Sequence, residues 1–290
     1  MTSGADEQVE IEAYKARELL AFLLLNRERA LHREVLAGHL WHDAPMDRAK
    51  QYLRKALWQL QHALAEEDAP DSIILVSGDW IELNPDADLW VDTHVLENAY
   101  QAVRRLPAED LTVDLADLLS HSVQIYHGEL LTGWYQDWCL VERERHRHMH
   151  LALLDKLMRY YAANGDYETG ISYGYLILGQ DRAHERTHRW LMRLHLFAGD
   201  RSGALRQFQQ CKKALAEELD VLPSERTQSL ARQIRQGVLH SETINKTPNA
   251  IVRPQLSDLH QNLTTLQVLL GTVQRQVGGL IDPGPPSPHS

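Results

Sequence analysis

Residues 46–83 read MDRAKQYLRKALWQLQHALAEEDAPDSIILVSGDWIEL, and this stretch decides the fold of the first part of the chain. Its first half carries apolar residues at the spacing of one helix face, namely Leu53, Ala56, Leu57, Leu60 and Leu64. The spacing predicts a helix from Asp47 or Arg48 to about Ala65, with Asp47 as its N-terminal cap.

The second half of the stretch predicts a β-hairpin. Residues 72–77 form an apolar, β-branched run, and residues 80–83 alternate apolar and polar side chains. Gly78-Asp79 between them is a turn signal. The expected tip, Ser77 to Asp79, contains no Arg or Lys.

Two shorter helices precede the long one. Helical periodicity predicts one helix from Tyr14 to Asn26 and a second from about His32 to Trp41. Helix, helix, longer basic helix and hairpin is the order of a winged helix, a variant of the helix-turn-helix. The sequence therefore predicts a winged helix-turn-helix with a β-hairpin wing.

From about Asp92 to the mid-230s the sequence reads as helix and contains an internal repeat. Asn164-Gly165-Asp166 recurs as Ala198-Gly199-Asp200, 34 residues later. At the same offset Leu157 and Met158 match Leu191 and Met192, and Gly170 matches Ala204. Two helices around a Gly-Asp turn, repeated every 34 residues, are typical of tetratricopeptide-like repeats. The predicted fold class is thus mainly α.

A heptad pattern occupies residues 255–281. Its apolar residues alternate spacings of three and four, which is typical of a coiled-coil oligomerisation helix: Leu256, Leu259, Leu263, Leu266, Leu270, Val273, Val277 and Leu280. A helix that packs back on its own chain is the alternative. The pattern does not distinguish a dimer from a tetramer.

These patterns divide the chain into six parts. We expect a flexible N-terminus (1–12), a winged-helix DNA-binding domain (13–90), a tetratricopeptide-like helical domain (91–240), a linker (241–254), the coiled-coil helix (255–281) and a disordered tail (282–290).

Composition and charge limit the classes of function. The 290 residues are 43% hydrophobic and 24% charged, as in globular proteins, and no apolar run approaches a membrane span. The polar N-terminus and the two isolated cysteines, Cys139 and Cys211, predict a cytoplasmic protein without disulfides. The net charge is −10, but residues 15–64 carry +4, which predicts a locally basic module.

The exposed face of the third helix supplies the candidate DNA contacts. The apolar stripe leaves six side chains outside: Arg48, Lys50, Gln51, Arg54, Lys55 and Trp58. Arg and Lys contact phosphate or guanine, and Gln reads adenine. Solvated surface charge is the alternative for each basic residue.

Metal and catalytic chemistry are not indicated. On a helix His146 and His150 share a face and His148 does not, so we expect no metal site. Gly128 to Gly133 lacks the Lys-Ser/Thr of a phosphate loop, and no nucleophile signature is present. The expected protein is not an enzyme and has no cofactor.

The chain resembles the SARP-type transcriptional regulators over residues 13–236. The segments that resemble the winged-helix domain of that family are residues 15–25, Trp41 and residues 49–57. Further phrases resemble the bacterial transcriptional activation domain of that family: residues 126–133, Trp138, 189–194, 198–200, 204–208 and 217–224. Two features depart from the family. About a dozen residues precede the first helix, so the small sheet expected there is missing or reduced to one strand, and Gln59 to His62 is neutral where the family often has a pair of arginines.

The resemblance implies a DNA-binding transcriptional regulator, and the regulators of that family are usually activators. Its expected partners are double-stranded DNA and further copies of itself, with RNA polymerase or another protein as a candidate and no membrane. The alternative is a protein-interaction scaffold whose winged helix no longer binds DNA. The acidic total charge and the neutral wing tip favour that alternative.

Overall fold

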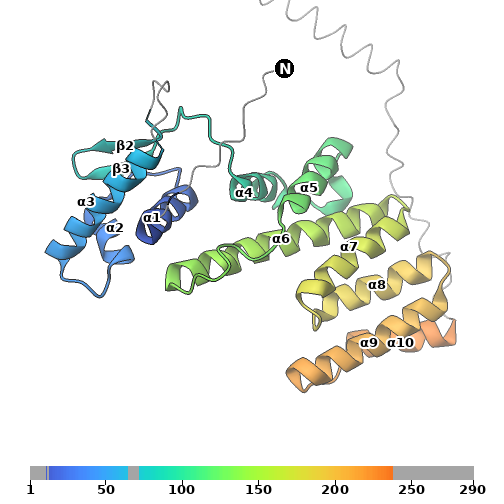
Figure 1. Ribbon diagram of the computed structural model, residues 1–290. Helices are drawn as coiled ribbons and strands as arrows, with labels where there is room; N and C mark the ends of the chain where they lie inside the picture. Colours follow the sequence, from blue (N-terminus) through green and yellow to red (C-terminus); the bar gives the residue numbers. More distant parts are fainter. Residues whose placement is uncertain (1–10, 12, 65–71, 238–290) are drawn as a thin grey trace, which may run out of the picture. The chain divides into compact units, whose positions relative to one another are not determined.

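The computed structural model describes residues 11, 13–64 and 72–237 (Figure 1). The chain divides into two compact units. One comprises residues up to Arg104 together with His121–His150, and the other Arg105–Ser120 together with the residues from Leu151 onward. The heptad segment 255–281 lies outside the described residues.

The first unit begins with the predicted winged helix (Figure 1). Its elements are α1 (Tyr14–Leu25), β1 (Leu31–His32), α2 (Arg33–Leu40), α3 (Met46–Ala63), β2 (Ile74–Ser77) and β3 (Trp80–Leu83). The strands form an antiparallel sheet in the order β1-β3-β2. The structure therefore confirms the winged helix-turn-helix and its hairpin wing.

One apolar core holds the winged helix together. Helix α3 buries Ala49, Leu53, Ala56, Leu57 and Leu60. They join the core formed by α1, α2 and the sheet, which contains Leu19, Leu23, Leu36, Leu40, Ile74 and Ile81. Burying each leucine contributes about 1.5–3 kcal/mol. This burial fixes the rotation of α3 about its own axis.

The predicted cap of the third helix was wrong, and two helix boundaries differ from the predicted ones by one or two residues. The second helix begins at Arg33, because His32 belongs to β1 and pairs with Trp80 of β3. A strand of two residues is too short to leave a periodic signal in the sequence. Pro45, rather than Asp47, precedes α3 as its cap residue, without a side-chain hydrogen bond, and α3 ends at Ala63.

The remaining described elements are helical, as predicted. They are α4 (Asp92–Val103), a 3-10 helix η1 (Ala108–Asp110), α5 (Val113–Ile125), α6 (Asp137–Ala163), α7 (Tyr167–Gln180), α8 (Glu185–Phe197), α9 (Arg201–Leu219) and α10 (Glu225–Gln236). Helix α8 packs against both α7 and α9 (Figure 1), and α10 packs against α9.

The internal repeat is confirmed in the geometry of its two turns. Gly165 and Gly199 both adopt a positive φ, of 78° and 79°. The aspartate after each glycine then caps the following helix: Asp166 Oδ1 accepts from Thr169 N at 3.2 Å, and Asp200 Oδ1 accepts from Gly203 N at 2.7 Å. A positive φ suits glycine, and an aspartate cap satisfies an otherwise unpaired N–H. Two equal turns at the same offset explain the Gly-Asp repetition. The tetratricopeptide assignment itself stays a prediction.

The Pro223-Ser224 pair immediately before α10 anchors the start of that helix. Ser224, which precedes α10, donates its N–H to Glu185 Oε1 at 2.9 Å and its hydroxyl to the same atom at 2.6 Å. Burial alone would raise the pKa of the Glu185 carboxyl, but these hydrogen bonds, with that from Thr227, hold the pKa below its ordinary value. An ionised Glu185 therefore ties the start of α10 to α8.

Gly174 allows the close approach of α7 and α8. A Cβ atom at this position would lie 2.5 Å from Cδ2 of Leu191. Gly179, on the same helix, has no atom within 4 Å of such a Cβ. The two glycines therefore form a matched pair, one packed and one open.

We expect Gly174→Ala to destabilise the protein and Gly179→Ala to stabilise it. Overpacking costs about 1–3 kcal/mol, which outweighs the helix-propensity gain of about 1 kcal/mol for Gly to Ala. Only the propensity gain applies at Gly179. Thermal unfolding of the two variants beside the parent chain measures the difference. A Gly174→Ala midpoint at or above the parent value would contradict the close packing.

Candidate nucleic-acid interface

Five of the six residues predicted to contact DNA are exposed to solvent on one face of α3. Arg48, Gln51, Arg54, Lys55 and Trp58 are exposed, on the side of the helix away from its buried stripe. Trp58 is 65% exposed, which is unusual for a tryptophan that has no partner surface. We name these five side chains the α3 face.

Lys50, the sixth predicted residue, differs from the other five. It is partly buried, and its Nζ donates to Oε1 of Glu34 on α2 at 2.5 Å. The hydrogen bond from Lys50 lowers the pKa of the Glu34 carboxyl, and the same bond raises the pKa of Lys50. Lys50 is thus held in an ion pair, whereas Arg54 and Lys55 are exposed and have no ion-pair partner within the part of the chain that the structure describes.

Aromatic side chains extend the α3 face beyond the residues expected from the sequence. The Trp58 ring stacks on His62 at 5.5 Å between centroids, with an interplanar angle of 3°. Tyr52 is 45% exposed and lies near Trp41, with ring centroids 6.4 Å apart. The four-residue spacing of Trp58 and His62 was a signal available in the sequence.

An arginine stands beside the wing tip. Arg33, at the start of α2, donates its Nε to the carbonyl of Gly78 at 3.1 Å, and its backbone N–H donates to the carbonyl of Asp79 at 2.8 Å. Gly78 has a φ of +60°, as required at the first position of a type II′ hairpin turn. The tip itself has no basic residue, yet the fold brings one to it from 45 residues away. Sequence order alone did not indicate this.

The face formed by α3 and the wing can contact a polyanion. Arg48, Arg54 and Lys55 offer three cationic groups, and Gln51 adds an amide that can both donate and accept hydrogen bonds. Trp80 on the wing is 52% exposed and packs edge-on against His32, with centroids 5.3 Å apart. Cations, an amide and exposed rings on one helix and one hairpin are the groups that contact phosphates and bases.

The described residues also bear on metal binding, thiol chemistry and membrane insertion. Within them no group of three His, Cys, Asp or Glu side chains is placed to hold a metal ion. His146 and His150 share a buried helix face and His148 is exposed, as the helical spacing predicted. Burial raises the pKa of Cys139 to about 11 and that of Cys211 to about 12, so both are protonated thiols at neutral pH. In the described part of the chain, no helix is long and apolar enough to cross a membrane.

Half of the chain matches a known family. Residues 91–235 match the model of the family described as the bacterial transcriptional activator domain. This match confirms the predicted resemblance. The family and the fold are those of transcriptional regulators rather than of enzymes. No curated protein is significantly similar to the chain in sequence.

The fold is similar to that of a solved regulator. Mycobacterium tuberculosis EmbR, solved in complex with a low-affinity phosphopeptide, superimposes with a TM-score of 0.63 at 18% sequence identity. The similarity covers 90% of this chain and 66% of that chain, so this chain spans just under two thirds of the EmbR chain. The comparison confirms the mainly helical fold.

The ion pair between Lys50 and Glu34 gives a prediction for the free protein. Replacing Lys50 with Met removes the hydrogen bond that lowers the Glu34 pKa, so the pKa of Glu34 should rise toward its ordinary value of about 4.3. The matched control, Lys55→Met, should leave it unchanged. Carbon-detected NMR titration of the Glu34 carboxyl measures this shift. An equal response to both variants would show that Lys50 is as free as Lys55.

Proposed function

The chain belongs to the bacterial transcriptional activator domain family and to its SARP-type regulators, and from this premise we propose that it binds promoter DNA through α3. In the proposed complex α3 lies in the major groove and the wing contacts the flanking backbone. The observation that carries the proposal is the α3 face, which combines an exposed amide and ring with three cations that have no ion-pair partner among the described residues. Activation of transcription is part of the same proposal.

The side chains of the α3 face would make two kinds of contact with DNA, one with the phosphate backbone and one with the bases. Arg48, Arg54 and Lys55 are long cationic side chains that neutralise phosphates or reach guanine, and Gln51 has the bidentate amide that pairs with adenine. Lys50 stays a candidate contact, but it would have to exchange its exposed ion pair with Glu34 for a phosphate, so we do not count it among the three. Three phosphate contacts predict that the logarithm of affinity falls with the logarithm of salt with a slope of roughly −3 per subunit.

The test is a salt series on DNA from the region upstream of the protein's own gene. We expect the Arg54→Ala/Lys55→Ala variant to bind more weakly and to lose about 2 from the magnitude of the salt slope. The control variant, Lys212→Ala/Lys213→Ala, removes the same charge from an exposed part of α9. This control should bind DNA with the same affinity and the same salt dependence as the parent chain.

Two results would overturn the DNA proposal. One is an equal loss in both variants, which would mean that only the total charge matters. The other is no binding above a random duplex by a folded protein. That second result would favour the alternative function, a protein-interaction scaffold that uses the winged helix as a contact surface.

Self-association is the second part of the proposal. A single module with three cationic contacts binds DNA weakly, and the heptad residues between Leu256 and Leu280 offer a way to join two modules. They lie outside the described residues, so the proposal rests on the sequence pattern. RNA polymerase or another protein remains a proposed partner of the helical domain.

We expect the full-length chain to sediment as an oligomer and the Leu263→Glu/Leu270→Glu variant to sediment as a monomer. A charge at two core heptad positions is costly to bury in a helical interface. Analytical ultracentrifugation over a range of protein concentrations makes the measurement. An unchanged oligomer in the variant would assign association to another surface.

A further inference from the structure

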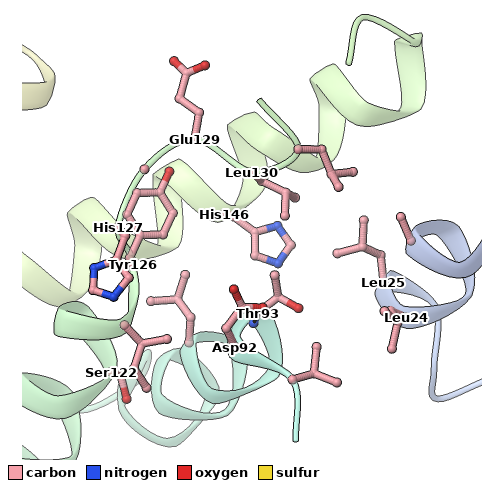
Figure 2. Close-up of a pocket in the computed structure, with 16 residues that line it drawn as sticks. Leu24, Leu25, Asp92, Thr93, Ser122, Tyr126, His127, Glu129, Leu130 and His146 are labelled. Carbon is pink, nitrogen blue, oxygen red and sulfur yellow. Dashed lines mark hydrogen bonds between the residues drawn. The ribbon is translucent and has the colours of Figure 1, made fainter. Parts of the chain in front are cut away.

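A cavity of about 360 Å³ lies within the first unit, beside α1 (Figure 2). Its walls come from α1, the start of α4, the end of α5 and the segment that follows it, and α6. The size falls in the lower part of the range of small-molecule sites, about 300–1,000 Å³. Most of the wall is apolar and includes Ala21, Leu24, Leu25, Leu96, Ile125 and Leu130.

A buried histidine lines this apolar cavity. The His146 side chain is 1% exposed, and Figure 2 shows its ring among the lining residues, near Asp92 and Thr93. Its Nδ1 lies 2.8 Å from the backbone carbonyl of Glu142. Because a carbonyl only accepts hydrogen bonds, Nδ1 must carry the proton. In the neutral ring, Nε2 is therefore an acceptor.

The Nε2 atom of His146 has no hydrogen-bond partner within the described residues. Oε1 of Glu97 lies 3.3 Å away and would pair with a protonated ring, but it cannot donate to Nε2 of a neutral ring, and Arg145 already binds that carboxylate. Buried polar atoms without a partner are rare in folded proteins, and each has a specific cause. A ligand that donates a hydrogen bond to Nε2 would satisfy the atom.

The charges around the cavity restrict the ligand. Asp92 and Glu129 contribute to the wall, and Glu97 lies beside His146. Arg145 pairs with Glu97 and Arg143 lies 3.8 Å from Glu129, so Asp92 is the carboxylate of this group that most disfavours an anion. The apolar wall disfavours any fully charged molecule, because a charge loses its hydration there. The chemistry selects a compact, uncharged and mainly apolar molecule with one hydrogen-bond donor, such as a hydroxyl.

An arginine holds one wall of the cavity in place. Arg143 donates to three backbone carbonyls, those of Leu130 and Leu131 at 2.8 Å each and that of Trp134 at 3.0 Å. Leu131 has a φ of +50°, which a leucine rarely adopts, so these bonds help to hold the loop in an otherwise unfavourable conformation. A wall that is formed in advance lowers the entropy cost of binding.

We propose that this cavity is a binding site for a small uncharged molecule whose hydroxyl group donates to Nε2 of His146. The site goes beyond the proposed DNA binding and is independent of the α3 face. Since α1 belongs to the core of the winged helix and also lines the cavity, an occupant contacts the DNA-binding module directly.

The test compares three probes with one ring system: 2-naphthol, naphthalene and 2-naphthoate. Calorimetric titration of the full chain should show saturable binding of one 2-naphthol per chain. Naphthalene cannot donate the hydrogen bond, so its affinity should be about threefold to tenfold lower than that of 2-naphthol. The carboxylate of 2-naphthoate should weaken binding further, because it meets the acidic wall.

Variants place the binding in the cavity. Ala21→Phe fills the cavity from α1 and should abolish 2-naphthol binding, whereas Ala102→Phe adds the same bulk at an exposed position of α4 and should not. His146→Phe keeps a ring but removes the acceptor, so 2-naphthol and naphthalene should bind it equally. If Ala21→Phe fails to fold, as judged by circular dichroism, Leu25→Trp fills the cavity in its place.

Several results would overturn the proposal. They are the absence of saturable binding, 2-naphthoate binding as tightly as 2-naphthol, and a preference for 2-naphthol that survives in His146→Phe. The last result would mean that the hydroxyl donates to another acceptor of the cavity wall rather than to His146. None of these measurements involves DNA, so failure here is distinguishable from failure of the proposed regulator function.

Discussion

The rotation of α3 is the constraint on which the DNA-binding proposal depends. Five side chains, Ala49 to Leu60, are buried in the core that α3 shares with α1, α2 and the sheet. Turning the helix by half a turn would place these apolar groups in water and cost several kcal/mol, at about 1.5–3 kcal/mol for each large side chain. The outward direction of Arg48, Gln51, Arg54, Lys55 and Trp58 is a consequence of this burial.

The helical domain depends on a different constraint, the geometry of its repeated turn. A glycine with positive φ reverses the chain, and the aspartate that follows it caps the next helix. Small residues at Gly170, Gly174 and Ala204 then let successive helices approach closely. The Gly-Asp turn and the small residue at Gly170 and Ala204 occur twice because the sequence repeats them, whereas Gly174 has Phe208 at the same offset. The same local turn therefore joins both helix pairs.

Periodic and local features of the fold were predictable from the sequence. The three helices, the hairpin turn at Gly78 and the repeated Gly-Asp turn depend on neighbours within a few residues, and the sequence shows those neighbours directly. The two-residue strand β1 was not predictable, because it exists only through its pairing with β3. The cap of α3 was assigned to Asp47, whereas the helix begins after Pro45.

The details of the candidate sites were less predictable because they depend on long-range contacts. Glu34 reaches Lys50 and Arg33 reaches the wing only after α2 has packed on its neighbours. The cavity beside α1 combines residues from 21 to 146, and His146 was considered in the sequence only as a metal ligand. Spacing could show that His146 and His150 share a face, but not that Nε2 of His146 would be buried without a partner.

The most direct test of the central claim is a cross-link between α3 and DNA. A cysteine at Gln51 would lie in the middle of the exposed face, and the two native cysteines are buried and so should not react. With a duplex that carries a thiol-tethered base, the account predicts a disulfide cross-link for Gln51→Cys and none for Lys212→Cys on α9. Equal cross-linking at both positions, or none at Gln51→Cys by a protein that binds the duplex, would contradict the placement of α3 in the groove.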